Sequence, residues 1–84
     1  MRKIKRRRED IEWLKALGKH LEELIRAKGF KSPYAFWVEA LGDEVSRASL
    51  NYILKGEVDV KATTLKKLAD SLEITPRDIL DFNL

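Results

Sequence analysis

Apolar side chains recur at steps of three and four residues between about Asp10 and Lys28, and this spacing places them on one face of an α-helix. Charged side chains occupy many of the other positions, and Gly29 ends the pattern. A glycine inside this helix, Gly18, costs about 1 kcal/mol relative to alanine, so we expect another helix to approach the backbone closely there. The apolar positions are Ile11, Leu14, Leu17, Leu21, Leu24 and Ile25.

The stretch from Ser46 to Gly56 is predicted to be a short helix whose two ends are both marked by residue type. A serine hydroxyl can accept a hydrogen bond from the first free amides of a helix, and a glycine can end it in the left-handed conformation. Leu50, Ile53 and Leu54 have the i, i+3, i+4 spacing of a buried face. The opposite face carries Arg47, Ala48, Asn51, Tyr52 and Lys55.

That opposite face holds a guanidinium, a carboxamide, a phenol and an ammonium group around one small methyl group. Such groups can hydrogen-bond to base edges and phosphates in the major groove of DNA. The alternative interpretation is an ordinary surface helix with mixed polar side chains, and this stretch alone does not decide between the two.

An earlier helix is predicted to start at Ser32, a capping serine, followed by Pro33 at the first helical position. It ends at Gly42, and residues 43–45 form a turn. Two short helices joined by a glycine-containing turn, with a polar outer face on the second, form a helix-turn-helix over about residues 32–56. The aromatic residues of the first helix, Tyr34, Phe36 and Trp37, are most simply core residues.

The C-terminal third is predicted to complete an all-α bundle. Thr63 or Thr64 is expected to cap a helix that buries Leu65, Leu68, Ala69 and Leu72. Thr75, Pro76 and Asp78 have the order of a capping box and open a last helical turn. Ile79, Leu80 and Phe82 are expected to be buried by that turn; the alternative for Phe82 and Leu84 is packing across the two-fold axis of a dimer.

Composition restricts the class of protein. The chain has 84 residues, 44% of them hydrophobic and 37% charged, which fits one compact domain with a modest core. With no cysteine and one histidine, a disulfide framework and a Cys/His zinc site are excluded, and no cofactor is expected. No apolar run approaches the roughly 20 residues of a membrane span, so we expect a cytoplasmic protein. His20 is expected to lie on the exposed side of its helix and is assigned no role.

No arrangement of residues predicts an enzyme. The sequence has no paired carboxylates in an apolar setting, no nucleophile with a base, no glycine-rich phosphate loop and no metal-ligand spacing. The expected function is therefore binding.

The net charge of +3 is unevenly distributed. Residues 1–8 contain six of the seventeen Lys and Arg residues and no acid, so residues 9–84 carry eleven bases against fourteen acids. Within that part, residues 26–67 sum to +3, whereas residues 9–25 and 68–84 each sum to −3. A basic arm and a basic middle segment between acidic ends are typical of a surface that binds a polyanion.

The N-terminal eight residues are expected to form a disordered basic arm ahead of a single domain at 9–84. Such an arm can bind DNA phosphates without sequence preference. A localisation signal, a solubilising tail and an RNA-binding arm are the alternatives. Its basic residues are Arg2, Lys3, Lys5, Arg6, Arg7 and Arg8.

The span from about Leu21 to Phe82 resembles the Cro and lambda-repressor type of helix-turn-helix domain, the XRE family. The resemblance rests on Gly42, Val45, Ser46, Leu50, Ile53, Lys55, Gly56, Leu65, Leu68, Ala69, Leu72, Ile74, Ile79 and Leu80. It implies a compact five-helix, lambda-repressor-like bundle that binds double-stranded DNA. It also implies a prokaryotic or phage origin.

By this resemblance, the base-reading residues would be Arg47, Ala48 and Tyr52, with Asn51 beside them. The phosphate-binding residues would be Lys31, Ser32, Ser46, Ser49, Lys55 and Lys61.

The sequence departs from the family pattern in the motif itself. The turn has two extra residues, Asp43 and Glu44, so either the angle between the two helices or the length of the first helix must differ. The two carboxylates of this insertion are expected on the side of the motif that faces DNA, unless the turn directs them away from it. Val38 stands where the family has a small alanine, which predicts bulkier packing between the two helices.

The expected function is that of a transcriptional regulator, most simply a repressor, that binds an inverted repeat as a homodimer. The alternative is a protein-interaction or antitoxin-like module that contacts a protein partner through Trp13, Tyr34 and Trp37 and binds nucleic acid only through its arm.

Overall fold

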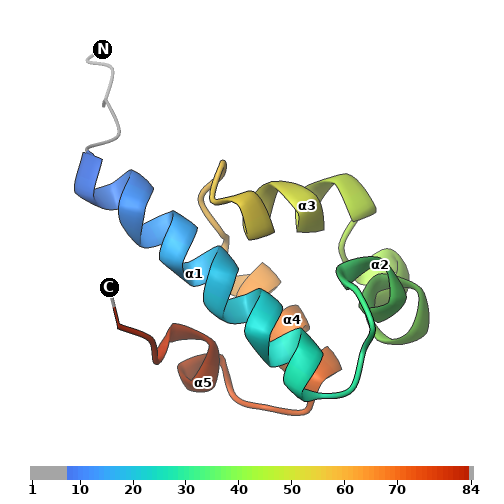
Figure 1. Cartoon of the computed structure of the whole chain (residues 1–84). Helices are drawn as coiled ribbons and strands as arrows, with labels where there is room; N and C mark the ends of the chain where they lie inside the picture. Colours follow the sequence, from blue (N-terminus) through green and yellow to red (C-terminus); the bar gives the residue numbers. More distant parts are fainter. Residues whose placement is uncertain (1–7, 84) are drawn as a thin grey trace.

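The computed structural model describes residues 8–83, and over this range it is all-helical, with five α-helices and no strand (Figure 1). The helices are α1 (Arg8–Ala27), α2 (Pro33–Phe36), α3 (Arg47–Lys55), α4 (Ala62–Leu72) and α5 (Pro76–Leu80). The prediction of an all-α bundle is confirmed. Arg8, assigned to the arm from the sequence, is the first residue of α1. The predictions for Arg2, Lys3, Lys5, Arg6, Arg7 and Leu84 fall outside the described residues.

Helix α1 is the longest element, and Figure 1 shows α3 along one side of it, α5 along the other and α4 behind. Its apolar stripe enters the core as the spacing predicted, except that Ile11 is 37% exposed and Leu24 is only partly buried. The completely buried side chains come from every helix and include Leu21, Phe36, Leu50, Leu68 and Ile79.

The predicted close approach at Gly18 is confirmed. A Cβ atom built on Gly18 would lie 2.7 Å from the carbonyl oxygen of Ile53 and would overlap that of Leu54. At the end of α3, Gly56 has φ 73°, and a Cβ there would lie 2.7 Å from the backbone of Lys15. Two glycines therefore let the backbones of α1 and α3 come closer than any side chain would permit.

The two extra residues of the turn are accommodated by a change of helix type. After α2, the chain widens into a π-helical turn (Trp37–Leu41) and then tightens into a 3-10 turn (Gly42–Glu44). Gly42 takes φ 59°, a conformation that other residues rarely adopt. The prediction that Val38 makes the helix packing bulkier is wrong, because its side chain is 53% exposed.

The predicted cap of α4 is also wrong. Lys61 is the N-cap residue, with extended backbone and no side-chain hydrogen bond, and the helix begins at Ala62. Thr63 and Thr64 therefore lie inside the first turn instead of before it.

The capping box of α5 is confirmed. The Thr75 hydroxyl accepts from the Asp78 amide at 3.2 Å, and the Asp78 carboxylate accepts from the Thr75 amide at 3.0 Å. Hydrogen bonds from the amide and then the hydroxyl of Thr75 lower the pKa of the Asp78 carboxyl below its ordinary value of 3.8.

His20 joins α1 to the C-terminal segment, contrary to its expected place on the exposed side. Its ring is half-buried, and Nε2 donates to the Asp78 carbonyl oxygen at 3.0 Å. Phe82 lies against it, with ring centroids 5.6 Å apart, and also against Trp13 at 5.1 Å. Phe82 thus packs within its own chain. No helix in the described part of the chain is long and apolar enough to cross a membrane.

Candidate nucleic-acid interface

Helix α3 is defined at both ends by its own residues, as predicted. The Ser46 hydroxyl accepts a hydrogen bond from the Ser49 amide at 3.1 Å and donates one to the Ser49 hydroxyl oxygen at 2.8 Å. At the other end, the Gly56 amide donates to the Ile53 carbonyl oxygen at 3.0 Å. These caps satisfy backbone groups that a nine-residue helix would otherwise leave unpaired.

The two faces of α3 differ sharply in exposure. Leu50 and Ile53 are 1% and 4% exposed, and Leu54 is partly buried against the core. All five side chains expected on the outer face are exposed: Arg47, Ala48, Asn51, Tyr52 and Lys55. The structure therefore brings the predicted base-reading residues together on one accessible surface. Lys55 lies in the last turn, where the helix dipole favours a cation.

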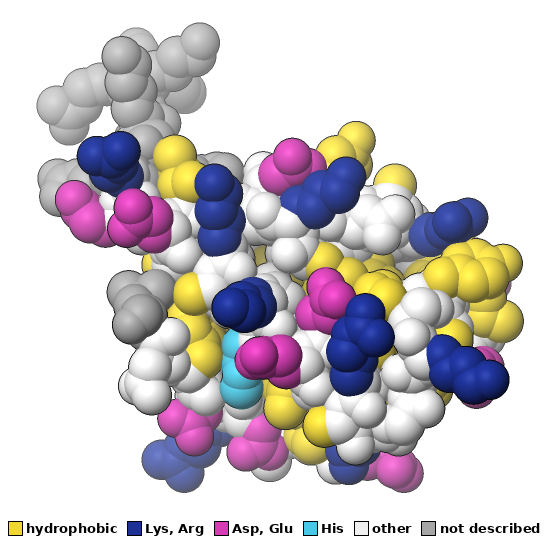
Figure 2. Space-filling view, viewed as in Figure 1, with side chains coloured by type: hydrophobic (Ala, Val, Ile, Leu, Met, Phe, Trp, Pro, Cys, Tyr) yellow, Lys and Arg dark blue, Asp and Glu magenta, His cyan; other side chains and the backbone are white. Residues whose placement is uncertain are grey.

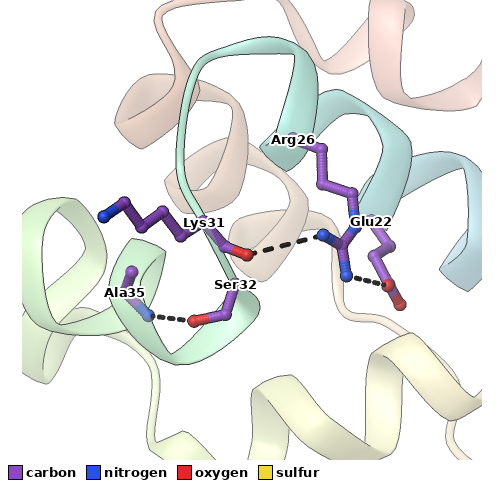
Figure 3. A network of polar contacts seen from close by, with 5 residues as sticks. All are labelled: Glu22, Arg26, Lys31, Ser32 and Ala35. Carbon is purple, nitrogen blue, oxygen red and sulfur yellow. Dashed lines mark hydrogen bonds and ion pairs between the residues drawn. The ribbon is translucent and has the colours of Figure 1, made fainter.

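Two predicted phosphate-binding residues lie in the segment that leads into α2 (Figure 3). The Arg26 guanidinium donates to the Lys31 carbonyl oxygen at 3.4 Å and pairs with the Glu22 carboxylate at 3.1 Å. The Ser32 hydroxyl accepts from the Ala35 amide at 3.1 Å, so it caps α2. In Figure 3 the Lys31 ammonium group extends away from Arg26, and it is accessible for a phosphate contact.

Three other phosphate candidates gather beside the first turn of α3, whereas Lys55 lies at its other end. Ser46, Ser49 and Lys61 line one open hollow of about 450 Å³, together with Tyr52. Glu44 and Asp59 also line it, so one carboxylate of the turn insertion lies on the same side as the candidate residues. Because the Ser46 and Ser49 hydroxyl groups are hydrogen-bonded to each other at 2.8 Å, one of their two protons is left available to a phosphate.

The aromatic residues of the α2 segment do not all enter the core. Phe36 is completely buried, but Trp37 is half-buried and Tyr34 is 52% exposed. In Figure 2, apolar side chains gather at the edge of the molecule where Figure 1 places α2. The prediction that all three are core residues is therefore wrong.

Tyr34 and Trp37 contact the start of α3, which the sequence analysis missed. The Trp37 indole N–H donates to the Val45 carbonyl oxygen at 2.8 Å, one residue before the Ser46 cap. The ring centroids of Tyr34 and Trp37 are 6.2 Å apart in a stacked arrangement. The guanidinium carbon of Arg47 lies 4.5 Å from the centroid of the Tyr34 ring. The i, i+3 spacing of the two aromatic residues was the one available indication that they share a face.

Comparison with known proteins supports the resemblance. Residues 20–84 match the family model of the Cro/C1-type HTH DNA-binding domain. No curated protein and no solved structure matches the chain. The match covers more than three quarters of the sequence, including α2, α3, α4 and α5. The chain therefore belongs to the family of Cro/C1-type helix-turn-helix DNA-binding domains.

Proposed function

We propose that this DNA-binding domain is a transcriptional repressor that binds an inverted repeat as a homodimer, with α3 of each copy in the major groove. One observation carries the proposal: α3 is fixed by its buried face and presents a guanidinium, a carboxamide, a phenol and an ammonium group on its exposed face. Nine residues at about 1.5 Å per residue give a helix of about 14 Å. An α-helix is about 10 to 12 Å across with its side chains, so it fits a major groove about 12 Å wide.

Each exposed side chain suits a particular part of the DNA. Arg47 can donate two hydrogen bonds to guanine O6 and N7, and Asn51 can pair with adenine N6 and N7. The Ala48 methyl group suits contact with a thymine methyl group. Lys31, Lys55 and Lys61 carry exposed ammonium groups for phosphates on either side.

Dimerisation follows from size. A single small module buries little surface on DNA, and two copies on a two-fold axis double the contacts. The two α3 helices would then enter successive major grooves, with half-site centres about 34 Å apart. A bound repressor would act by occupying the promoter.

Selection from a random duplex library with the full-length chain tests the proposal. Enrichment of an inverted repeat with half-sites one helical turn apart, bound by two copies of the chain, is the expected result. Placing that site in a promoter should lower transcription when the protein is added. Recovery of DNA without any enriched sequence, lost steeply as salt is added, would contradict the proposal and leave only phosphate binding.

The exposure of two aromatic side chains favours one other function. Tyr34 is 52% exposed and Trp13 is 39% exposed, as a surface that contacts a protein partner would require. Trp37 fits this role less well, since its indole N–H is bonded to Val45. Under this alternative, the full chain would select no DNA sequence, and substitution of Trp13 would abolish partner binding.

A further inference from the structure

Arg47 occupies an electrostatically unfavourable position. It is the first residue of α3, where the free amides give the helix N-terminus a partial positive charge. The first turn of α3 contains no acidic residue to offset this charge. Arg47 also forms no ion pair with any residue in the range 8–83. An aromatic ring is one partner that can stabilise an exposed cation at this place without an opposite charge.

The Tyr34 ring is that partner. The face of an aromatic ring carries a partial negative charge, and the Arg47 guanidinium carbon lies 4.5 Å from the centroid of this ring. Contact with a ring face leaves the N–H groups at the edge of the guanidinium free to donate to a base. The contact therefore holds the side chain without using the groups that would read DNA.

The Tyr34 ring is itself held in place relative to the start of α3. Its ring stacks on Trp37, and the Trp37 indole N–H is bonded to the Val45 carbonyl oxygen, two residues before Arg47. The ring and the start of α3 are thus linked by contacts on both sides, and α2 and α3 cannot shift independently without breaking one of them.

We infer that Tyr34 is a specificity-determining residue, which positions the Arg47 guanidinium for a two-pronged contact with one guanine. The inference rests on the proposed function, and it adds a residue outside α3 to the residues that determine base specificity. An unsupported arginine loses rotamer freedom when it binds a base, and it can also settle on a neighbouring phosphate. An arginine already held on a ring loses less freedom and is aimed at one base position.

The test compares base preferences of five forms of the full chain: wild type, Tyr34→Leu, Tyr34→Phe, Arg47→Ala and the double variant Tyr34→Leu with Arg47→Ala. Each is used in selection from a random duplex library, followed by binding to duplexes changed at one position. Tyr34→Leu removes the ring, whereas Tyr34→Phe keeps the ring and removes only the hydroxyl, so it is the matched control. Affinity for unrelated DNA and the thermal unfolding midpoint show that each variant is folded.

Tyr34→Leu should lower discrimination about threefold to tenfold at the base position that Arg47→Ala affects, and at no other position. Tyr34→Phe should keep the wild-type preference. In the double variant Tyr34→Leu with Arg47→Ala, the loss should equal that of Arg47→Ala alone, because the tyrosine acts through the arginine.

Three results would overturn the inference. They are that Tyr34→Leu leaves every base preference intact, that it lowers the preference at all positions equally, or that it sharpens the preference at the Arg47 position. The last result would mean that the ring holds Arg47 away from DNA. The proposed function fails separately, if the wild-type chain selects no sequence. If the wild type selects a site and Arg47→Ala changes it but Tyr34→Leu does not, only the inference about Tyr34 is wrong.

Discussion

The nine residues of α3 form two faces, an inner face toward α1 and an outer face toward solvent. The two faces differ in how many contacts with the rest of the chain hold their side chains in place. The inner face meets α1 at backbone distance, through Gly18 and Gly56, and two of its apolar side chains, Leu50 and Ile53, are almost completely buried. The outer face meets the chain mainly at its start, where Arg47 lies over Tyr34. The inner face therefore sets where α3 lies, and the outer face is left exposed.

The largest expected effect on stability is the difference between substitutions of two neighbouring residues, one on each face of α3. Leu50→Ala leaves a cavity in the core and should cost about 2 to 5 kcal/mol of the free energy of unfolding. Asn51→Ala, one residue further on the exposed face, should change that free energy by less than about 0.5 kcal/mol but weaken sequence-specific DNA binding. Urea denaturation and DNA titration of both variants measure the contrast. Equal losses of stability would show that the two faces are not distinct.

Gly18→Ala tests the inner face from the side of α1. The added methyl group would meet the backbone carbonyls of α3, which cannot rotate away, so we expect a loss of about 1 to 3 kcal/mol. Alanine normally stabilises a helix by about 1 kcal/mol relative to glycine, so the expected sign is reversed here. Lys19→Ala, at the next and exposed position, is the control. Stabilisation of Gly18→Ala would contradict the close approach.

The start of α3 can be compared with the start of α4. Ser46→Ala removes a side-chain cap and should cost about 1 kcal/mol. Lys61→Ala should cost less than about 0.5 kcal/mol, because the Lys61 side chain makes no capping hydrogen bond. Thermal or urea unfolding of the two variants gives the difference. An equal cost at both positions would mean that the Ser46 hydroxyl does not stabilise the start of α3.

The smallest expected effect on stability concerns the cap of α5, which is not part of either face of α3. Since the folded protein lowers the pKa of Asp78 below 3.8, its contribution to stability is complete above that pH and is lost as the pH falls through the lowered value. The difference in unfolding free energy between wild type and Asp78→Asn should therefore shrink as the pH falls below about 4. A difference that stays constant with pH would show that the carboxylate charge has no part in the cap.

Elements whose cause is local were predictable from the sequence. The caps at Ser32, Ser46 and Thr75 and the end at Gly56 depend on residues close in the chain, and all four are present as expected. The partition of α3 into a buried and an exposed face follows from helical periodicity alone. The role of Gly18 could also be predicted, because a glycine inside a helix lowers its stability and close packing against another helix can explain why it is there.

Features that depend on neighbours distant in the chain were missed. A π-helical turn follows α2 over Trp37–Leu41, and Val38 within it is 53% exposed. The Arg47–Tyr34 contact depends on that geometry, and so does the bond from Trp37 to Val45. The prediction of a threonine cap for α4 was wrong by only a few positions, because the helix starts at Ala62, before both threonines.

The central claim is that the outer face of α3 reads DNA sequence, and Arg47→Ala tests it most directly. Base preferences of wild type and variant would be measured by selection from one random duplex library at near-physiological salt. We expect the variant to lose about 1 to 3 kcal/mol of discrimination at one base pair in each half-site, with other positions and thermal stability unchanged. An identical preference in both proteins would contradict the account and place the reading surface elsewhere.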